Sequence, residues 1–169
     1  MEMKYSRPTE GILRCRSKIY QKLRSSNSSL NWISGIGLRN DDISTLQLNH
    51  VYHRDLLLDR MSDVNGTETN LHAYSGLVWK TGKWTINPAV RVDHFIFNMH
   101  NLLDPEQLPS GQSKEATRVS PKLNFSYAQS DNVMWFLKTG MGFHSNDMRV
   151  VVTNKNENTL PYSVGADFG

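Results

Sequence analysis

The sequence lacks any run of apolar residues long enough to form a transmembrane helix. Such a helix needs about 18 or more predominantly apolar residues in succession. The chain has 169 residues, of which 38% are hydrophobic, and its mean hydropathy is -0.52. A transmembrane β-strand is not excluded, because it needs only ~9–11 residues with every second one apolar, and such alternation averages out in hydropathy.

Cysteine and net charge are also scarce. Cys15 is the single cysteine, which excludes an internal disulfide and a CxxC metal or redox motif. A net charge of +3 is too small to indicate a nucleic-acid partner. The basic excess lies early in the chain, where a solvated segment is favoured over an anion-binding face. Its members are Arg14, Arg16, Lys18, Lys22 and Arg24.

What the sequence does contain is a repeated alternation of apolar and polar residues. In residues 84–97, apolar side chains fill one parity, while Arg91 and Asp93 lie on the other. A period of two places these sets on opposite faces of a strand, and this strand is longer than the ~5–6 residues of an average globular strand. Similar patterns predict strands over residues 32–38, 46–52, 71–79, 119–127 and 133–143, with a weaker one around 13–23.

The predicted connections alternate in length. Short ones are expected at residues 40–43, 80–83 and 129–132, and long ones at 59–70, 98–117 and 144–160. Outer-membrane barrels alternate short periplasmic turns with long extracellular loops. We therefore predict an all-β fold, an antiparallel meander of about six to seven long strands that belongs to a transmembrane β-barrel. Residues 29–169 form this barrel region, and residues 1–28 are a poorly assigned N-terminal segment with room for one weak strand.

The alternation also predicts which face meets which environment. In a membrane barrel the apolar parity faces lipid and the polar parity faces the lumen. The lumen-facing candidates are Arg91, Asp93, Lys122 and Lys138. Aromatic residues beside the short turns predict an interfacial girdle, formed by Trp79, Trp84, Tyr127 and Trp135. Because proline removes a ladder hydrogen bond, bulges are expected at Pro88 and Pro121.

Several stretches together resemble the TonB-dependent outer-membrane receptors. AVRVD at residues 89–93 is similar to a GLRYD type of barrel strand, and SPKL at 120–123 resembles the strand that follows an external loop. GIGLRNDD at 35–42 resembles a strand leading into a turn. GMGFHSND at 140–147 resembles the strand end with GFHSND found in Bacteroidetes-like receptors.

The resemblance implies a transporter in the Gram-negative outer membrane. Its partners would be membrane lipid, a plug domain touched by the lumen-facing side chains, the TonB complex, and a small nutrient of the siderophore, vitamin or glycan class. It implies no enzymatic activity and no cofactor. A barrel of this family closes with about 22 strands, and residues 1–20 lack the apolar core of a signal peptide. The resemblance therefore implies that the chain is an incomplete part of a large transmembrane β-barrel, and we expect a fragment that does not function alone.

The alternative is a small self-contained β-barrel or sandwich that binds a ligand, and its strands should be shorter. No catalytic site is expected, because the neighbours His144, Ser145 and Asp147 do not supply the geometry of a triad. No metal site is expected at His50 and His53 either, since these residues point to opposite faces of a strand.

Overall fold

One antiparallel sheet contains almost all of the chain that can be described. The computed structural model describes residues 2–5, 10–52, 56–103, 111–144, 151–152 and 160–169. The strands are β1 (Glu2–Tyr5), β2 (Glu10–Arg24), β3 (Ser28–Tyr52), β4 (Leu56–Thr81), β5 (Trp84–Asn101), β6 (Gln112–Ser130), β7 (Val133–Phe143) and β8 (Tyr162–Phe168). The predicted all-β class and antiparallel meander are confirmed. No helix among these residues is long and apolar enough to cross a membrane.

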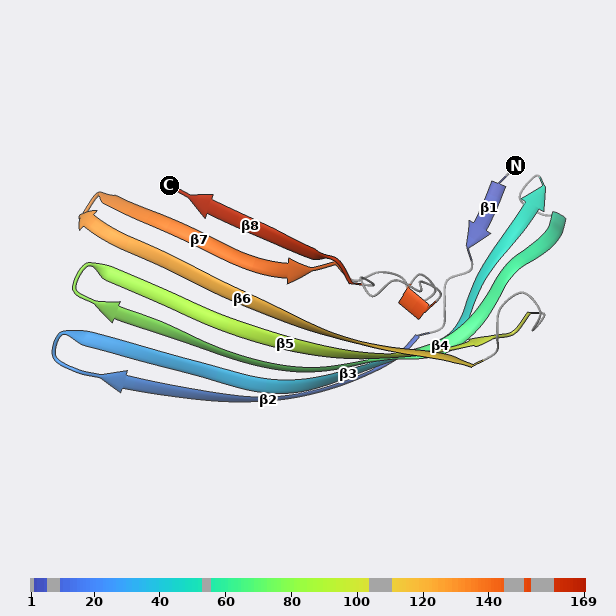
Figure 1. Cartoon of the computed structure of the whole chain (residues 1–169), viewed down its shortest axis with the longest axis horizontal. Helices are drawn as coiled ribbons and strands as arrows, with labels where there is room; N and C mark the ends of the chain where they lie inside the picture. The colour runs from blue at the N-terminus through green and yellow to red at the C-terminus, as the bar shows by residue number, and fades with distance from the viewer. Residues whose placement is uncertain (1, 6–9, 53–55, 104–110, 145–150, 153–159) are drawn as a thin grey trace.

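The strands follow one another across the sheet in the order β1-β3-β4-β5-β6-β7-β8, and β2 also pairs with β3 (Figure 1). β1 and β2 share one edge of β3, because β2 pairs with its first part and β1 with its far end. The strand expected around residues 13–23 is β2. Within the described residues, no ladder joins β2 to β8, so the sheet is open.

Two predicted connections are wrong. Residues 40–43 continue β3, and residues 59–70 continue β4, so these strands form a hairpin of 25 and 26 residues. The local sequence is polar there and resembles a turn, but the ladder continues with register shifts beyond Ile43. In Figure 1 the end of the hairpin beyond Ile43 bends away from the other strands, with β1 beside it. The long connection predicted at residues 98–117 is shorter, since β5 reaches Asn101 and β6 begins at Gln112.

The bulges predicted at the two prolines are also wrong. The ladder between β5 and β6 passes Pro88 and Pro121 without a register shift. Between β4 and β5, pairing is interrupted from Gly76 to Trp79, opposite Pro88, and resumes in the same register. The missing N–H of proline therefore removes local bonds without inserting a residue.

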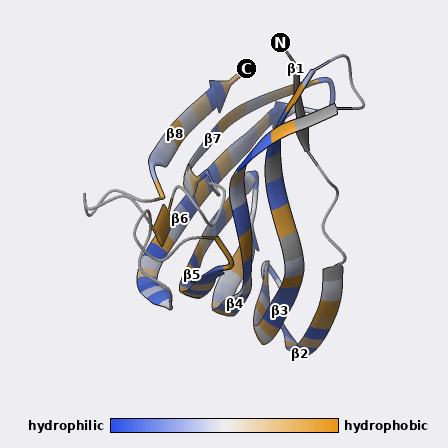
Figure 2. Cartoon of the chain, turned by 90° about the vertical axis from the view of Figure 1, so that its right-hand side faces the viewer, coloured by the Kyte–Doolittle hydropathy of each residue, from blue (hydrophilic) through white to orange (hydrophobic). Residues whose placement is uncertain are grey.

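The two faces of the sheet differ in chemistry. We call the face that carries Arg91 and Asp93 the inner face, and the opposite one the outer face. Figure 2 shows the alternation of hydrophilic and hydrophobic residues along the strands. The outer face has a band of exposed apolar side chains, which runs from Trp84 to Val92 on β5 and from Leu71 to Trp79 on β4. No Lys, Arg, Asp or Glu lies on the described outer face within this band.

A small core lies on the inner face, toward the end with the long connections. It joins residues of β4 and β5 to two residues of the segment between β7 and β8. Its buried members are Val64, Phe95, Phe97, Met99, Val151 and Leu160. Arg118 Nε donates a hydrogen bond of 2.7 Å to the Leu160 carbonyl, and His144 N donates one of 3.0 Å to Pro161. These contacts hold the described residues of the β7–β8 connection against the inner face.

Candidate functional site

The charged side chains of the strands gather on the inner face. Antiparallel pairing puts directly opposed residues on the same face, so the register identifies the members. All the basic residues of β2 fall on one parity and pair with inner-face positions of β3. The basic set includes Arg14, Arg16, Lys18, Lys22, Arg24, Arg39, Arg91, Arg118, Lys122 and Lys138. The acidic set is smaller and includes Asp41, Glu68, Asp93 and Asp167.

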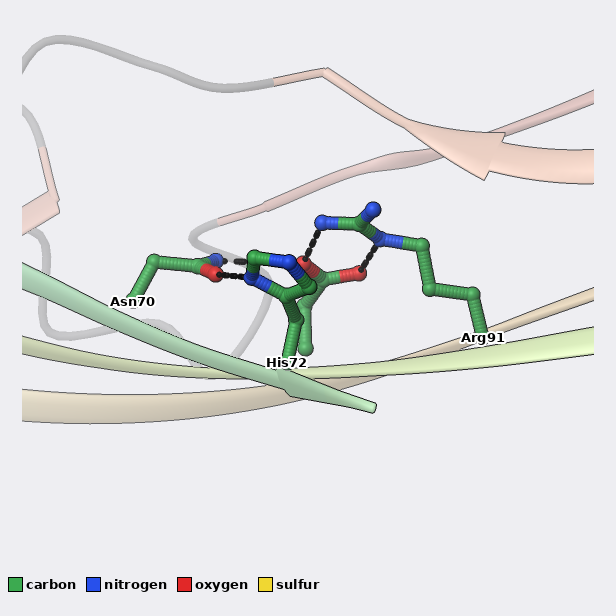
Figure 3. A network of polar contacts seen from close by, with 4 residues as sticks. Asn70, His72 and Arg91 are labelled. Carbon is green, nitrogen blue, oxygen red and sulfur yellow. Dashed lines mark hydrogen bonds and ion pairs between the residues drawn. The ribbon is translucent and has the colours of Figure 1, made fainter. Parts of the chain in front are cut away.

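A hydrogen-bonded network on β4 and β5 forms the centre of this surface (Figure 3). Arg91 Nε and Nη2 donate to the two carboxylate oxygens of Asp93, at 2.8 and 2.7 Å. Asn70 Nδ2 donates to Asp93 at 3.1 Å, and His72 Nδ1 lies 3.0 Å from Asn70 Oδ1. Asp93 is only 1% exposed. A buried carboxylate is costly unless it is paired, and the bidentate contact with Arg91 provides that pairing.

Glycines on β3 make room for the rings that flank this network. A Cβ at Gly35 would lie 2.7 Å from the Tyr74 ring, and one at Gly37 would lie 2.6 Å from His72 Nε2. Only hydrogen fits at this separation, so the rings lie directly over the glycine backbone. Tyr74 and His72 thus pack closely against Gly35 and Gly37.

Beside the network the inner face is hollowed. The hollow has a volume of about 280 Å³, and β2, β3, β4 and β5 all contribute to its lining. Arg14, Arg16, Arg39 and Arg91 bring positive charge to it, and Phe95 adds an apolar wall. This arrangement can hold a negatively charged group, since arginine presents several donors in a planar fork.

Glu68 lines the hollow just beyond the apolar band. Burial raises the pKa of the Glu68 carboxyl, and the carboxylate of Asp41, directly opposite on β3, raises it further. Arg39 opposes this shift. Ionisation of Glu68 is therefore less favourable than it is for a carboxyl group in water.

The structure brings together two of the four polar residues selected from the sequence. Arg91 and Asp93 are bonded, as described above. Lys122 and Lys138 share the inner face with them but lie on β6 and β7, away from the network. Lys138 Nζ lies 3.6 Å from an exposed carboxylate oxygen of Asp167.

The four aromatic residues chosen for a girdle lie near the short turns on the outer face. Trp84 pairs with Tyr127, which pairs with Trp135 on the next strand. The Trp84 and Tyr127 ring centroids are 4.6 Å apart. Trp79 lies on β4, close to the same turn as Trp84, and all three indoles are 44% to 58% exposed.

Sequence reasoning missed Asn70, His72 and the alignment of the β2 cations. The alternation of Arg14, Arg16 and Lys18 was visible in the sequence, and it was the signal for a one-sided row. Asn70 and His72 carried no local signal, because their role depends on the register between β4 and β5.

Comparisons with known proteins agree with this geometry. The family described as TonB dependent receptor-like, beta-barrel matches residues 16–168. Among solved structures, the ferric citrate transporter FecA in its unliganded form is similar in fold, with a TM-score of 0.67 and 16% sequence identity. The aligned region covers 79% of this chain but 20% of that transporter. A comparison with curated protein sequences finds no match.

Proposed function

Because this chain belongs to the family of TonB-dependent receptor-like β-barrels, we propose that it forms one sector of an outer-membrane transporter for a small nutrient. Members of this family are transporters of the Gram-negative outer membrane. The observation that carries the proposal is the division of the sheet into two faces. Among the described residues, an outer band without Lys, Arg, Asp or Glu opposes an inner face on which basic and acidic side chains are concentrated.

The dimensions of the apolar band support a membrane position. Trp84 to Val92 spans about 27 Å along the strand at ~3.4 Å per residue. A strand tilt of ~40° reduces this to about 20 Å, and the side chains at both ends bring it near the ~25 Å apolar band of outer-membrane barrels. Exposure of large apolar side chains such as Trp84 (48%) and Val90 (42%) would be unfavourable in water, whereas lipid covers them.

The lengths of the connections indicate how the sheet is oriented in the membrane. The short turns lie at one end of the sheet and would be periplasmic, while the long connections would be extracellular. Trp79, Trp84, Tyr127 and Trp135 then form an aromatic girdle at the periplasmic interface, where amphipathic rings are favoured. Residues 29–169 serve as barrel wall, and β2 extends the same wall into residues 1–28.

The inner face is proposed to line the lumen. Arg91, Asp93, Lys122 and Lys138 would contact a plug domain, which in turn responds to the TonB complex. The open edges at β2 and β8 require further strands, because unpaired backbone groups are not tolerated in bilayer hydrocarbon. The sector therefore works only within a larger barrel of the size found in this family, and it supplies wall and binding surface with no bond-breaking step.

A fractionation experiment tests the proposal. The full-length protein that contains this chain should sediment with outer membranes, and an unboiled sample should migrate differently from a boiled one on a gel. Cells should take up a nutrient complex only when TonB is present, with the siderophore class tested first because the structural neighbour carries ferric citrate. A protein in the soluble fraction with no heat-dependent shift would favour the small self-contained barrel or sandwich and end the proposal.

A further inference from the structure

The ladder between β2 and β3 contains a destabilising pair of like charges. Arg14 is directly opposite Arg39 on the inner face, and Arg16 follows two positions along. Like charges directly opposite each other disfavour an antiparallel pair. Arg39 Nε donates to Asp41 at 2.9 Å, but within the described residues no carboxylate pairs with Arg14 or Arg16. Both side chains are exposed.

The same arginines line the hollow, where positive charge exceeds negative charge. The carboxylate of Asp93 is already engaged by Arg91 through two hydrogen bonds. Glu68 is the other carboxylate in the lining, and it is half-buried. Among the described residues, Arg14 and Arg16 thus have no carboxylate bonded to them, and they line a cavity with room for a small group.

We propose that this hollow is an anion-binding subsite that receives a carboxylate or phosphate group of the transported ligand. The proposal rests on the proposed function and specifies the substrate class. The volume of about 280 Å³ suits one anionic group of a ligand. The guanidinium forks of Arg14 and Arg16 can bind it by charge-assisted hydrogen bonds, and the anion relieves the repulsion between Arg14 and Arg39.

The position of the hollow favours an incoming ligand. It lies at the outward limit of the apolar band, beside the Phe95 core that anchors the β7–β8 connection. A group that arrives from the long connections reaches this level before it reaches the short turns. Lys22 and Arg24, on the same face of β2, lie at the opposite end and do not line the hollow. They provide a matched control with the same charge change on the same strand.

Binding of a defined probe tests the subsite in the full-length protein that contains this chain. The purified protein in detergent is titrated with tricarballylate at low salt, and the neutral trimethyl ester is the control ligand. We expect the wild type to bind tricarballylate and not the ester. The double variant Arg14→Gln with Arg16→Gln should lose about tenfold or more in affinity, whereas Lys22→Gln with Arg24→Gln should change it by about twofold or less.

The possible failures are distinguishable. Equal losses in the two double variants would mean a diffuse field along the strand and would overturn a local subsite. An assembled, heat-modifiable wild type that binds no tricarballylate would also overturn it, because carboxylates elsewhere in the protein would then neutralise the arginines. The proposed function survives both results. It fails separately if the protein is absent from the outer-membrane fraction.

Discussion

A positive charge placed at the centre of the outer face tests whether that face meets lipid. Leu123 lies midway along the apolar part of β6, paired with Pro88 and Thr139, and its side chain is 40% exposed. An arginine at the bilayer midplane costs ~2–4 kcal/mol. Since 1.4 kcal/mol is a factor of ten, Leu123→Arg should lower the folding equilibrium constant by about 30-fold to 1,000-fold.

Two matched variants separate a lipid effect from a packing effect. Asn124→Arg places the same side chain on the inner face. The expected cost there is only about 1 kcal/mol, from repulsion by Lys138 directly opposite. Val119→Arg lies at the outward limit of the band, where the cost falls to about 0–1 kcal/mol. Unfolding in urea of the full-length protein in phosphatidylcholine vesicles gives the three free energies. A loss below about 1 kcal/mol for Leu123→Arg, or an equal loss for Asn124→Arg, would refute a lipid-facing outer surface.

Substitutions at Asp93, Glu68 and Gly35 test the inner face through the free energy of unfolding of the same full-length protein. Asp93→Asn should cost about 1.5–3 kcal/mol, because it removes the charge-assisted hydrogen bonds between Arg91, which is 45% exposed, and a buried carboxylate. Asp167→Asn, at an exposed pair, should cost less than about 1 kcal/mol. Because the pKa of Glu68 is raised on folding, its stabilising contribution is complete below the ordinary glutamate value of about 4.5. This contribution is lost as the pH rises through the pKa of the folded state. Glu68→Gln should therefore stabilise the protein at pH 7 and have no effect near pH 4. Gly35→Ala should cost about 1–3 kcal/mol by displacing the Tyr74 ring, and the cost should shrink in a Tyr74→Ala background.

The alternation of side chains made the sheet predictable from the sequence. Each strand of the band repeats apolar and polar residues with period two, so its type and its two faces follow from local sequence alone. The β7 strand was placed at residues 133–143, and the structure has Val133–Phe143. The strongest pattern, at residues 84–97, begins β5 at Trp84 as predicted but continues to Asn101.

The ends of the long hairpin could not be predicted in the same way. Residues 40–43 and 59–70 have no apolar face, so they carry no pattern that separates a strand from a turn. They stay extended because each provides the other with a partner for its backbone hydrogen bonds. Likewise, Phe95 and Phe97 share a parity with Arg91 and Asp93, and their burial depends on Leu160, which approaches from far along the chain.

The level at which the apolar band ends divides the chain into parts with different sources of stability. Under the proposed function, the outer side chains below that level gain from contact with lipid. The extension of β3 and β4 above it would lie in water and must be stabilised by its own contacts. Asp63 there accepts hydrogen bonds from Gln47 at 3.0 Å and from Arg60 at 2.9 Å, while Val64 is 1% exposed. Because these contacts are separate from the apolar band, we expect the stability of the extension to be independent of the stability of the band.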